Sequence, residues 1–365
     1  MTLISTFWAV SPIWSQPAFW VRGLAVILTA LALAYGAPAS AAPGFSVADG
    51  TIIGPDGKPF VARGVNVSGP NWVWHHKTAP DAALIADCWG FNLVRVNIFL
   101  FPETKYPQVD DNNDLDAIVQ AFTSRGIVVV IEAHDRIGSF FAGADLKYLA
   151  DWYAGLARKY RGNPYVWFDI MNEPGGYGPP DGDKWLLTHR TAIAAIRDTA
   201  GADNIILVEG TTWGQDTGRL TPEPVTVAES AILGLAGEVT AFGGKTYDNI
   251  VFSIHVYDMW NFPPAKLAAY IAEVKRRHLA LLIGEYGSET DDGLSTLPAT
   301  RAMFEVAVPQ QVGRAVWHWD GGTVNTLTIG RPGGGWQIDS CTAPHNLTPL
   351  GQLVWNDNHP AGEPS

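Results

Sequence analysis

Short apolar runs recur along the chain, and most of them stop at a polar or charged residue. Each run is rich in Val, Ile, Leu, Phe or Trp, a composition that is typical of a buried β-strand. This pattern predicts strands at residues 60–67, 93–98, 127–132, 166–171, 205–209, 250–255, 280–284 and 315–319.

Helix-like segments lie between these runs, at residues 81–89, 115–125, 145–160, 184–199, 226–235, 265–277, 295–308 and 350–355. Eight strands that alternate with about eight helices favour the α/β class and a closed (β/α)8 TIM barrel. An open, doubly wound sheet is the alternative, but residues 64–69 (Gly-Val-Asn-Val-Ser-Gly) do not match the G-x-G-x-x-G turn of that fold.

Two segments flank a turn at the start of this pattern. Residues 45–53 and 58–67 are separated by Gly54-Pro55-Asp56-Gly57, a set of strong turn formers. The sequence therefore predicts an N-terminal β-hairpin.

The first residues have the pattern of a signal peptide. Arg22 precedes the apolar run 24–34, and Ala39-Ser40-Ala41 offers small residues for cleavage near Ala41/Ala42. We therefore expect residues 1–41 to be removed on export and residues 42–365 to form a single (β/α)8 domain. A retained membrane anchor, or a start codon placed too early, are the alternatives for the part before Arg22.

Net charge limits the classes of binding partner, and cysteine content limits the possible disulfides and metal sites. The formal net charge is −12, and Lys and Arg form no basic run, which argues against nucleic acid and anionic membranes as partners. Cys88 and Cys341 could form one disulfide in an exported chain, but the sequence does not show that they are close. Because a zinc site would need more ligands of this kind, we expect no zinc.

Polar residues follow nearly every predicted strand. In a (β/α)8 barrel, chemistry gathers at the carboxyl ends of the strands and in the loops after them. The residues at or near these ends are Arg95, Asn97, Glu132, His134, Asp135, Asn172, Glu173, Glu209, His255, Tyr257, Glu285, Trp317 and Trp319.

Two of these residues form a candidate catalytic pair. Glu173 follows the apolar run 165–171, and Glu285 follows the apolar run 281–284. Strands four and seven stand across the mouth of a barrel, so both carboxylates can face one bound bond. Two carboxyl groups about 5 Å apart perform retaining glycoside hydrolysis, one as acid/base and one as nucleophile. The structural alternatives are that Glu173 accepts a hydrogen bond in a loop and that Glu285 belongs to an ion pair at the barrel rim. Glu209 is a rival candidate for the catalytic carboxylate.

The surrounding residue types suit such a site. Arg95, in the middle of an apolar strand, would keep a nucleophile ionised, while His255 and Tyr257 could bond to the carboxylates or to sugar hydroxyls. Glu132 and Asp135 are interpreted as structural. We interpret His75, His76 and His318 as surface or loop residues.

Tryptophans offer platforms for sugars, since the flat C–H faces of sugars stack on aromatic rings. Trp317 is the predicted platform under the cleaved sugar. Candidates in predicted loops or strand ends are Trp72, Trp74, Trp213, Trp260, Trp317 and Trp336, whereas Trp89, Trp152 and Trp167 are predicted core residues.

Taken together, these motifs resemble glycoside hydrolase family 5 of clan A. The resemblance rests on segments 90–95, 132–135, 171–174, 253–257, 283–287 and 316–319, in that order. It implies Glu173 as acid/base, Glu285 as nucleophile, Asn172 on the sugar 2-hydroxyl, and Arg95 and Tyr257 steadying Glu285. It further implies that His134, His255 and Trp317 line the site, with no metal or organic cofactor. The predicted substrate-binding residues are Arg95, His134, Asn172, His255, Tyr257, Trp213 and Trp317.

The substrate expectation rests on two further segments. Residues 134–138, with Trp213-Gly214-Gln215-Asp216, resemble the β-1,4-mannanase branch, although that branch usually has small hydroxyl residues at Arg136 and Ile137. We therefore expect a secreted, monomeric, retaining endo-β-1,4-glycanase that acts on a plant-type polysaccharide, with mannan slightly favoured. An endoglucanase with the same mechanism is the alternative, and a non-catalytic glycan-binding barrel is the alternative of another class.

Overall fold

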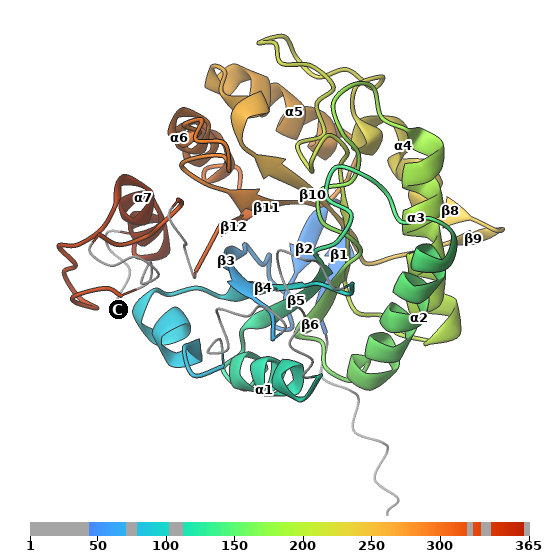
Figure 1. Ribbon diagram of the computed structural model, residues 1–365, viewed down its shortest axis with the longest axis horizontal. Coiled ribbons are helices and arrows are strands. Elements are labelled where there is room, and N and C mark those ends of the chain that lie inside the picture. The colour runs from blue at the N-terminus through green and yellow to red at the C-terminus, as the bar shows by residue number, and fades with distance from the viewer. Residues whose placement is uncertain (1–43, 71–78, 102–111, 320–323, 330–336, 361–365) are drawn as a thin grey trace, which may run out of the picture. The chain divides into compact units, whose positions relative to one another are not determined.

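The computed structural model describes residues 44–70, 79–101, 112–319, 324–329 and 337–360. Eight parallel strands form a closed barrel in the order β3-β4-β5-β6-β7-β10-β11-β12, which confirms the predicted (β/α)8 fold and rules out the open sheet (Figure 1). The barrel strands are β3 (Arg63–Ser68), β4 (Leu93–Ile98), β5 (Val128–Ala133), β6 (Val166–Asp169), β7 (Ile206–Glu209), β10 (Ile250–Val256), β11 (Leu281–Tyr286) and β12 (Gly313–Val316).

Helices follow the strands and surround the barrel (Figure 1). They are α1 (Asn112–Thr123), α2 (Gly143–Tyr160), α3 (Gly182–Ala194), α4 (Ala231–Thr240), α5 (Pro264–Arg276), α6 (Leu297–Ala307) and α7 (Pro349–Asn358). The shorter elements are the π-helical turns η1 (Leu84–Cys88) and η2 (Ala195–Thr199), the 3-10 turn η3 (Asp258–Trp260) and the strand pair β8 (Ala241–Phe242) and β9 (Lys245–Thr246). In the described part of the chain, every helix is too short or too polar to cross a bilayer.

Helix α4 begins later than its predicted start at residue 226. Ser230 is the N-cap, and its side chain accepts a hydrogen bond from the main-chain N–H of Leu233. Buried Asp216 also accepts from the N–H of Ala231 at 2.9 Å. These acceptors satisfy N–H groups that the first helical turn leaves unpaired, so the helix starts at residue 231.

The N-terminal hairpin exists, but its predicted turn is wrong. Strands β1 (Ser46–Ala48) and β2 (Thr51–Ile53) pair around Asp49 and Gly50, whose φ angles are +49° and +71°. Two consecutive positive φ values make the tight turn that suits a two-residue hairpin. Across residues 54–57 the two segments pair only through an isolated bridge between Ile53 and Pro59, in which Phe60 N–H donates to Ile52 O and Gly54 N–H to Lys58 O, both at 2.8 Å.

Inward-facing side chains change character along the barrel axis. On β4, Leu93 lies in an apolar cluster inside the barrel, whereas Arg95 and Asn97, two and four residues further on, are buried polar groups. Phe45, which precedes the hairpin, packs against Trp167 in the same apolar cluster, with ring centroids 5.2 Å apart. The amino end of the barrel is therefore apolar and covered, and its polar carboxyl end is left for chemistry.

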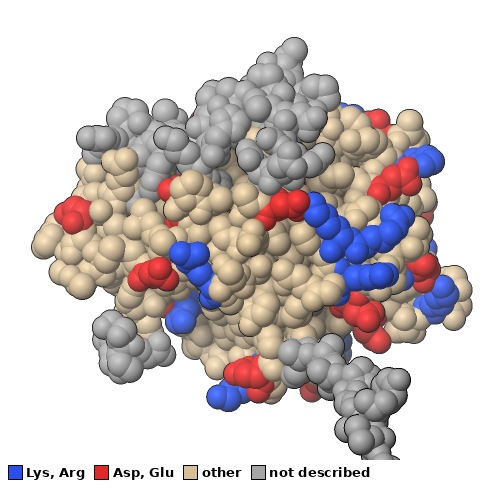
Figure 2. All heavy atoms as spheres, turned by 90° about the horizontal axis from the view of Figure 1, so that it is seen from below, with Lys and Arg blue, Asp and Glu red and all other residues tan. Residues whose placement is uncertain are grey.

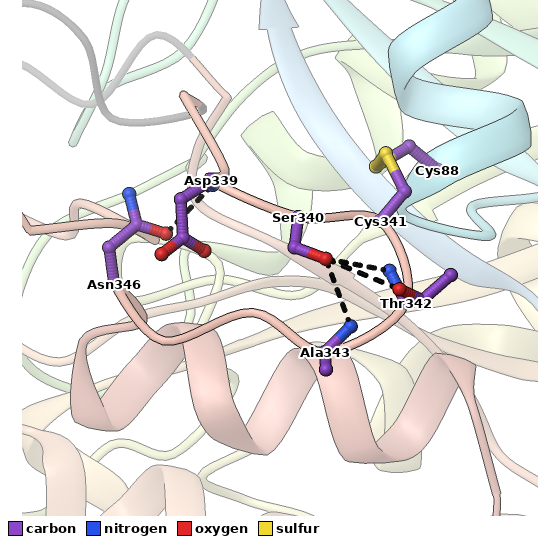
Figure 3. Close-up of a disulfide and its surroundings, with 7 residues drawn as sticks. All are labelled: Cys88, Asp339, Ser340, Cys341, Thr342, Ala343 and Asn346. Carbon is purple, nitrogen blue, oxygen red and sulfur yellow. Dashed lines mark hydrogen bonds between the residues drawn. A yellow bond between two sulfur atoms is a disulfide. The ribbon is translucent and has the colours of Figure 1, made fainter.

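Cys88 and Cys341 form a disulfide that joins η1 to the segment after β12 (Figure 3). Their Cα atoms are 5.1 Å apart, although the residues are 253 positions apart in the sequence. The bond therefore closes a very long loop. Next to it, Ser340 accepts from the main-chain N–H groups of Thr342 and Ala343 at 3.3 and 3.2 Å.

Removing this crosslink with the double substitution Cys88→Ser/Cys341→Ser is expected to lower the free energy of unfolding by about 2–4 kcal/mol, because the unfolded chain regains loop entropy. For a domain of this size the melting temperature should fall by roughly 3–6 °C in calorimetry. An unchanged melting temperature for the double variant would contradict a stabilising disulfide.

On the face of the molecule shown in Figure 2, several Lys and Arg side chains lie close together on one side, with Asp and Glu side chains next to them. Charged side chains form pairs at the protein surface, such as Arg276 with Glu273 at 2.7 Å. Exposed pairs of this kind contribute little to stability. On the face in view, Lys and Arg therefore do not form a continuous basic surface of their own.

Candidate active site

Arg95 is at the centre of a buried ionic cluster in the polar half of the barrel. Burial by itself lowers the pKa of Arg95, but the surrounding carboxylates raise it well above its ordinary value. An isolated buried cation is costly, so such a group needs several partners. Its partners come from four other barrel strands: Glu285 (2.8 Å), Glu209 (2.6 Å), Asp169 (2.8 Å) and Glu132 (3.7 Å).

Glu285, on β11, is held from two sides. Arg95 Nη1 donates to Glu285 Oε1 at 2.8 Å, and the hydroxyl of Tyr257 donates to Glu285 Oε2 at 3.0 Å. Donors at both oxygens stabilise the ionised carboxylate. These contacts are the ones that the sequence resemblance implied for Arg95 and Tyr257.

Glu173 lies just after β6, where the main chain bends sharply. Its φ of +50° is in the left-handed region, which residues other than glycine rarely adopt. Its main-chain N–H donates to Glu209 Oε2 at 2.7 Å, and its own Oε1 lies 3.0 Å from His255 Nδ1. The Glu173 side chain is 17% exposed, against 5% for Glu285.

The two carboxyl groups are close together. One oxygen of Glu173, one oxygen of Glu285 and a ring nitrogen of His255 all lie within 4.8 Å of one another. Retaining glycosidases hold their carboxyl groups about 5–5.5 Å apart, whereas inverting enzymes need about 6.5–9.5 Å to admit a water molecule. The separation in this chain corresponds to the retaining geometry.

A cavity of about 410 Å³ opens over this pair. Both carboxylates reach it, together with Asn172, whose Oδ1 accepts from Arg95 Nη2 at 2.9 Å. The other lining residues are His134, Ile137, Tyr177, Trp213, Gln215, Tyr257, Asp258, Glu289, Thr290, Asp291, Asp292, Leu294, Trp317 and Asn325. The cavity therefore combines a carboxylate pair with aromatic rings and many polar groups, as a carbohydrate cleft does.

A family model for cellulase (glycosyl hydrolase family 5) matches residues 53–323. The chain belongs to glycosyl hydrolase family 5. The matched span contains all eight barrel strands and both carboxylates of the pair. The chain is therefore a glycoside hydrolase.

Several proteins that are similar to this chain in sequence or structure are named mannanases. The chain is 27% identical over 308 residues to a mannan endo-1,4-beta-mannosidase from Streptomyces lividans, covering 82% of this chain and 73% of the relative. It is 28% identical to another from Cellvibrio japonicus, covering 85% of this chain and 66% of the relative. The solved beta-mannanase from Streptomyces thermolilacinus with mannohexaose is 26% identical, with a TM-score of 0.68, covering 88% of this chain and 96% of that one.

Two aromatic residues expected at the family 5 cleft lie where a sugar could stack. Trp317 follows the end of β12 and stacks on His134, with ring centroids 5.4 Å apart and planes 4° apart. Trp213, after β7, packs against Tyr177 at 4.2 Å. Gly138 is needed beside it, because a Cβ at this position, whose φ is +71°, would lie 2.5 Å from the Trp213 indole nitrogen.

Two predicted sugar contacts need correction. Arg95 and His255 are both fully buried, and neither lines the cavity. Contrary to the prediction, they do not contact a sugar directly. They lie behind Glu285 and Glu173 and hold these carboxylates in place. His134, Asn172, Tyr257, Trp213 and Trp317 do line the cavity.

The predicted platforms include one error. Trp260 is only 2% exposed, and its indole N–H donates to the main-chain oxygen of Gln215 at 3.1 Å, so it is a core residue. Trp89 and Trp167 are fully buried, as predicted, while Trp152 is partly buried against the core. Trp72, Trp74, His75, His76 and Trp336 lie outside the described residues, and His318 is half-buried.

The two acids interpreted as structural have structural contacts. Asp135 accepts from the main-chain N–H groups of Leu100 and Phe101 at 2.6 and 3.1 Å. Glu132 Oε2 accepts from Asn97 at 2.8 Å and lies 3.1 Å from His134 Nδ1. Glu209, the rival carboxylate, is fully buried and does not line the cavity, which excludes it as the group that meets the substrate.

Sequence reasoning missed several cavity residues. Gln215 bridges Asp258, at 2.8 Å, and the main-chain N–H of Met259, at 3.1 Å. The signal available in the sequence was the place of Gln215 in the segment Trp213-Gly214-Gln215-Asp216. Asn325, by contrast, accepts from the N–H groups of Ser288 and Glu289 and lies in a glycine-rich region without strand or helix periodicity, so no signal pointed to it.

One group of described residues has metal-ligand geometry, namely Glu173, His255 and Glu285. A histidine must be neutral to bind a metal ion. Burial lowers the pKa of His255, but the carboxylates of Glu209 and Glu285 raise it well above its ordinary value. Its protonated form competes with metal binding, and a metal-free site remains a prediction.

Proposed function

We propose that the chain is a retaining endo-β-1,4-glycanase in which Glu285 is the nucleophile and Glu173 is the acid/base. The observation that carries this proposal is the asymmetry of the close carboxylate pair. Glu285 accepts from Arg95 and Tyr257, which stabilise its negative charge, whereas Glu173 is the more exposed of the two. Charge therefore resides on Glu285, and a proton on Glu173 can reach the leaving oxygen.

In the first step, Glu285 attacks the anomeric carbon while the bond to the leaving sugar breaks. Glu173 transfers its proton to the departing oxygen, and a covalent glycosyl-enzyme forms. In the second step, Glu173 takes a proton from water, whose oxygen attacks the anomeric carbon and releases Glu285. Two inversions give net retention, and Glu173 ends the cycle protonated again.

The pH dependence should follow the shared proton of the pair. Burial and neighbouring Glu173 raise the pKa of Glu285, His255 and Arg95 lower it, and the net pKa is about 7. Since the two carboxyl groups are so close, the proton lost near pH 7 belongs to the pair. We expect kcat/KM to be bell-shaped: it falls above about pH 7, where the pair loses that proton, and at low pH, where the nucleophile is neutralised. A profile that stays flat from pH 4 to 9 would contradict the assignment.

We infer mannan as the favoured substrate and β-glucan as the second candidate. The support is the similarity to mannan endo-1,4-beta-mannosidases and to a beta-mannanase with bound mannohexaose, at 26–28% identity. Mannose and glucose differ at the 2-hydroxyl, so a single buried polar contact can discriminate strongly between them.

A reducing-sugar panel on mannan, glucomannan, carboxymethylcellulose, mixed-linkage glucan and xylan tests this inference. The highest kcat/KM is expected on mannan or glucomannan, with internal cleavage visible as an early fall in viscosity. Preference for carboxymethylcellulose would select the endoglucanase alternative, and activity confined to xylan would overturn both. Binding without any hydrolysis would select the glycan-binding barrel.

We also propose export from the cell, with a mature form that begins near Ala42. The support is the Arg22, apolar and Ala39-Ser40-Ala41 pattern. We propose that the mature protein is a monomer, and that it binds neither nucleic acid nor anionic membranes, since its net charge is strongly negative and its Lys and Arg form no basic run. Amino-terminal sequencing of the secreted protein checks the cleavage position.

A further inference from the structure

Glu209 is a third carboxylate that the proposed mechanism does not use. It ends strand β7, is fully buried and is absent from the cavity wall. Its Oε2 accepts from the main-chain N–H of Glu173 at 2.7 Å, and its Oε1 lies 2.6 Å from Arg95 Nη2 and 3.1 Å from His255 Nε2. We propose that Glu209 is a positioning residue: it holds the Glu173 main chain in place and keeps His255 as an imidazolium that orients the Glu173 carboxyl group.

The first half of this role concerns the main chain. A non-glycine residue at a φ of +50° carries a conformational cost of roughly 1–3 kcal/mol and keeps that conformation only when its surroundings impose it. Glu209 accepts the Glu173 N–H, while the Glu173 C=O accepts from the N–H of Gly138 at 2.8 Å. Both main-chain polar groups of the residue are therefore held, and its side chain is directed at the cavity.

The second half concerns the charge on His255. A neutral imidazole donates from only one of its two nitrogens. Here Nε2 faces Glu209 Oε1 at 3.1 Å, and Nδ1 faces Glu173 Oε1 at 3.0 Å, so a doubly protonated ring satisfies both contacts.

The other charged groups around the ring are on different strands. Glu285 Oε2, on β11, lies 3.5 Å from Nδ1, and Arg95, on β4, shares the Glu209 oxygen that faces Nε2. Burial by itself lowers the pKa of His255, but Glu209 and then Glu285 raise it well above its ordinary value. Glu285 loses its charge when it forms the glycosyl-enzyme, so Glu209 is the partner that remains charged throughout the reaction.

The loop after β7 is shaped to permit this contact. Gly214 has a φ of +71°, and a Cβ there would lie 2.8 Å from His255 Cγ and 3.2 Å from Glu209 Oε2. The Gly214 C=O also accepts from the main-chain N–H of His255 at 2.8 Å. Only a residue without a side chain lets this loop cover the His255–Glu209 pair, which is fully buried from solvent.

Glu209→Gln removes the negative charge and places an amide N–H₂ toward donors on at least one side. Because Glu209 does not touch the sugar, we expect KM to change little and kcat on mannan to fall on the order of 10²-fold, the effect of a misplaced acid/base group. Asp169→Asn is the matched control, since Asp169 is also fully buried and pairs with Arg95 at 2.8 Å but comes from β6 and is not among the partners of His255.

Two measurements separate this role from a merely structural one. The first is the ¹⁵N spectrum of histidine-labelled protein, with His255 assigned by comparison with His255→Gln. In the wild type, His255 should remain an imidazolium through pH 8. In Glu209→Gln it should lose its proton below pH 8, and in Asp169→Asn it should keep it.

The second measurement compares leaving groups. 2,4-Dinitrophenyl β-mannobioside needs no proton to release its phenolate, so for this substrate the cleavage step should lose far less in Glu209→Gln than it does for mannan. Pre-steady-state release of dinitrophenolate reports that step. Asp169→Asn should lose equally on both substrates, because it acts on the Arg95 cluster rather than on the acid.

This inference rests on the proposed function, and the two fail separately. A wild-type protein that cleaves no β-1,4-glycan would refute the proposed function. With an active wild type, equal losses of Glu209→Gln on both substrates, or a His255 that stays charged in that variant, would overturn the positioning role. If Glu209→Gln does not fold, the wild-type spectrum decides alone: a His255 that titrates at an ordinary histidine pH refutes the proposal, and one that stays charged supports it.

Discussion

Glu285→Gln is expected to lower kcat on mannan on the order of 10⁵-fold, the size of effect seen when a covalent nucleophile is removed. The reason is geometric. Glu285 is the carboxylate whose two oxygens face Arg95 and Tyr257, so it is the one prepared to carry charge and attack carbon. Gln has nearly the same shape and still fills the site, and polysaccharide binding in affinity electrophoresis should therefore persist.

The smaller variant Glu285→Gly makes the role testable by product chemistry. Added azide can enter the vacated space and attack an activated aryl β-mannobioside directly, giving the α-glycosyl azide by a single inversion. Glu289→Gln is the matched control, because Glu289 lines the same cavity outside the Arg95 and Tyr257 contacts, and it should stay within about tenfold of wild type. Residual hydrolysis by Glu285→Gln near the wild-type rate would remove Glu285 from the role.

The barrel could be predicted because its signal is local and repeated. Along β4, Val94 and Val96 face the outer apolar layer, while Leu93 and Arg95 face inward. Most of these strands are apolar runs that stop at a polar or charged residue, so the predicted strand bounds lie within about three residues of those in the structure. The hairpin turn could not be predicted in this way, because Asp49-Gly50 and residues 54–57 are both strong turn formers and the sequence does not choose between them.

The site could be predicted as a set of residues but not as an arrangement. Strand register decides which side chains meet, and at the critical point the register is irregular. The pairing of β10 with β11 shifts between Ile254 and His255, which brings His255 opposite Glu285. A shift of this kind has no sequence signature. The sequence could not show that His255, like Arg95, is buried behind the carboxylates and not at the sugar.

For Glu209, too, the sequence predicts the residue but not its contacts. The sequence places a carboxylate at the end of a strand, and the obvious interpretation is a competitor for the catalytic role. Only the contacts with Glu173 N–H and His255 separate a group that reacts from a group that holds another in place. Burial agrees with this distinction, since Glu209 has no exposed surface and Glu173 keeps 17% of its side chain exposed.

Glu173→Ala should lower kcat on mannan by about 10³- to 10⁴-fold, because both the protonation of the leaving oxygen and the activation of water are lost. The loss should depend on the substrate. With 2,4-dinitrophenyl β-mannobioside the first step needs no acid, so a burst of dinitrophenolate should precede a slow steady state in which the glycosyl-enzyme on Glu285 accumulates. Stopped-flow absorbance measures the burst, and mass spectrometry of the intact protein detects the adduct.

Azide then distinguishes the two carboxylates by stereochemistry. In Glu173→Ala, azide needs no general base and should attack the glycosyl-enzyme on Glu285, which accelerates turnover and yields the β-glycosyl azide after two inversions. Glu285→Gly should give the α-anomer, because there the azide itself replaces the missing nucleophile. The anomer from each variant therefore reports which carboxylate bonded to carbon. An α-azide from Glu173→Ala, or a burst-free time course with the activated substrate, would mean that the roles of Glu173 and Glu285 are reversed.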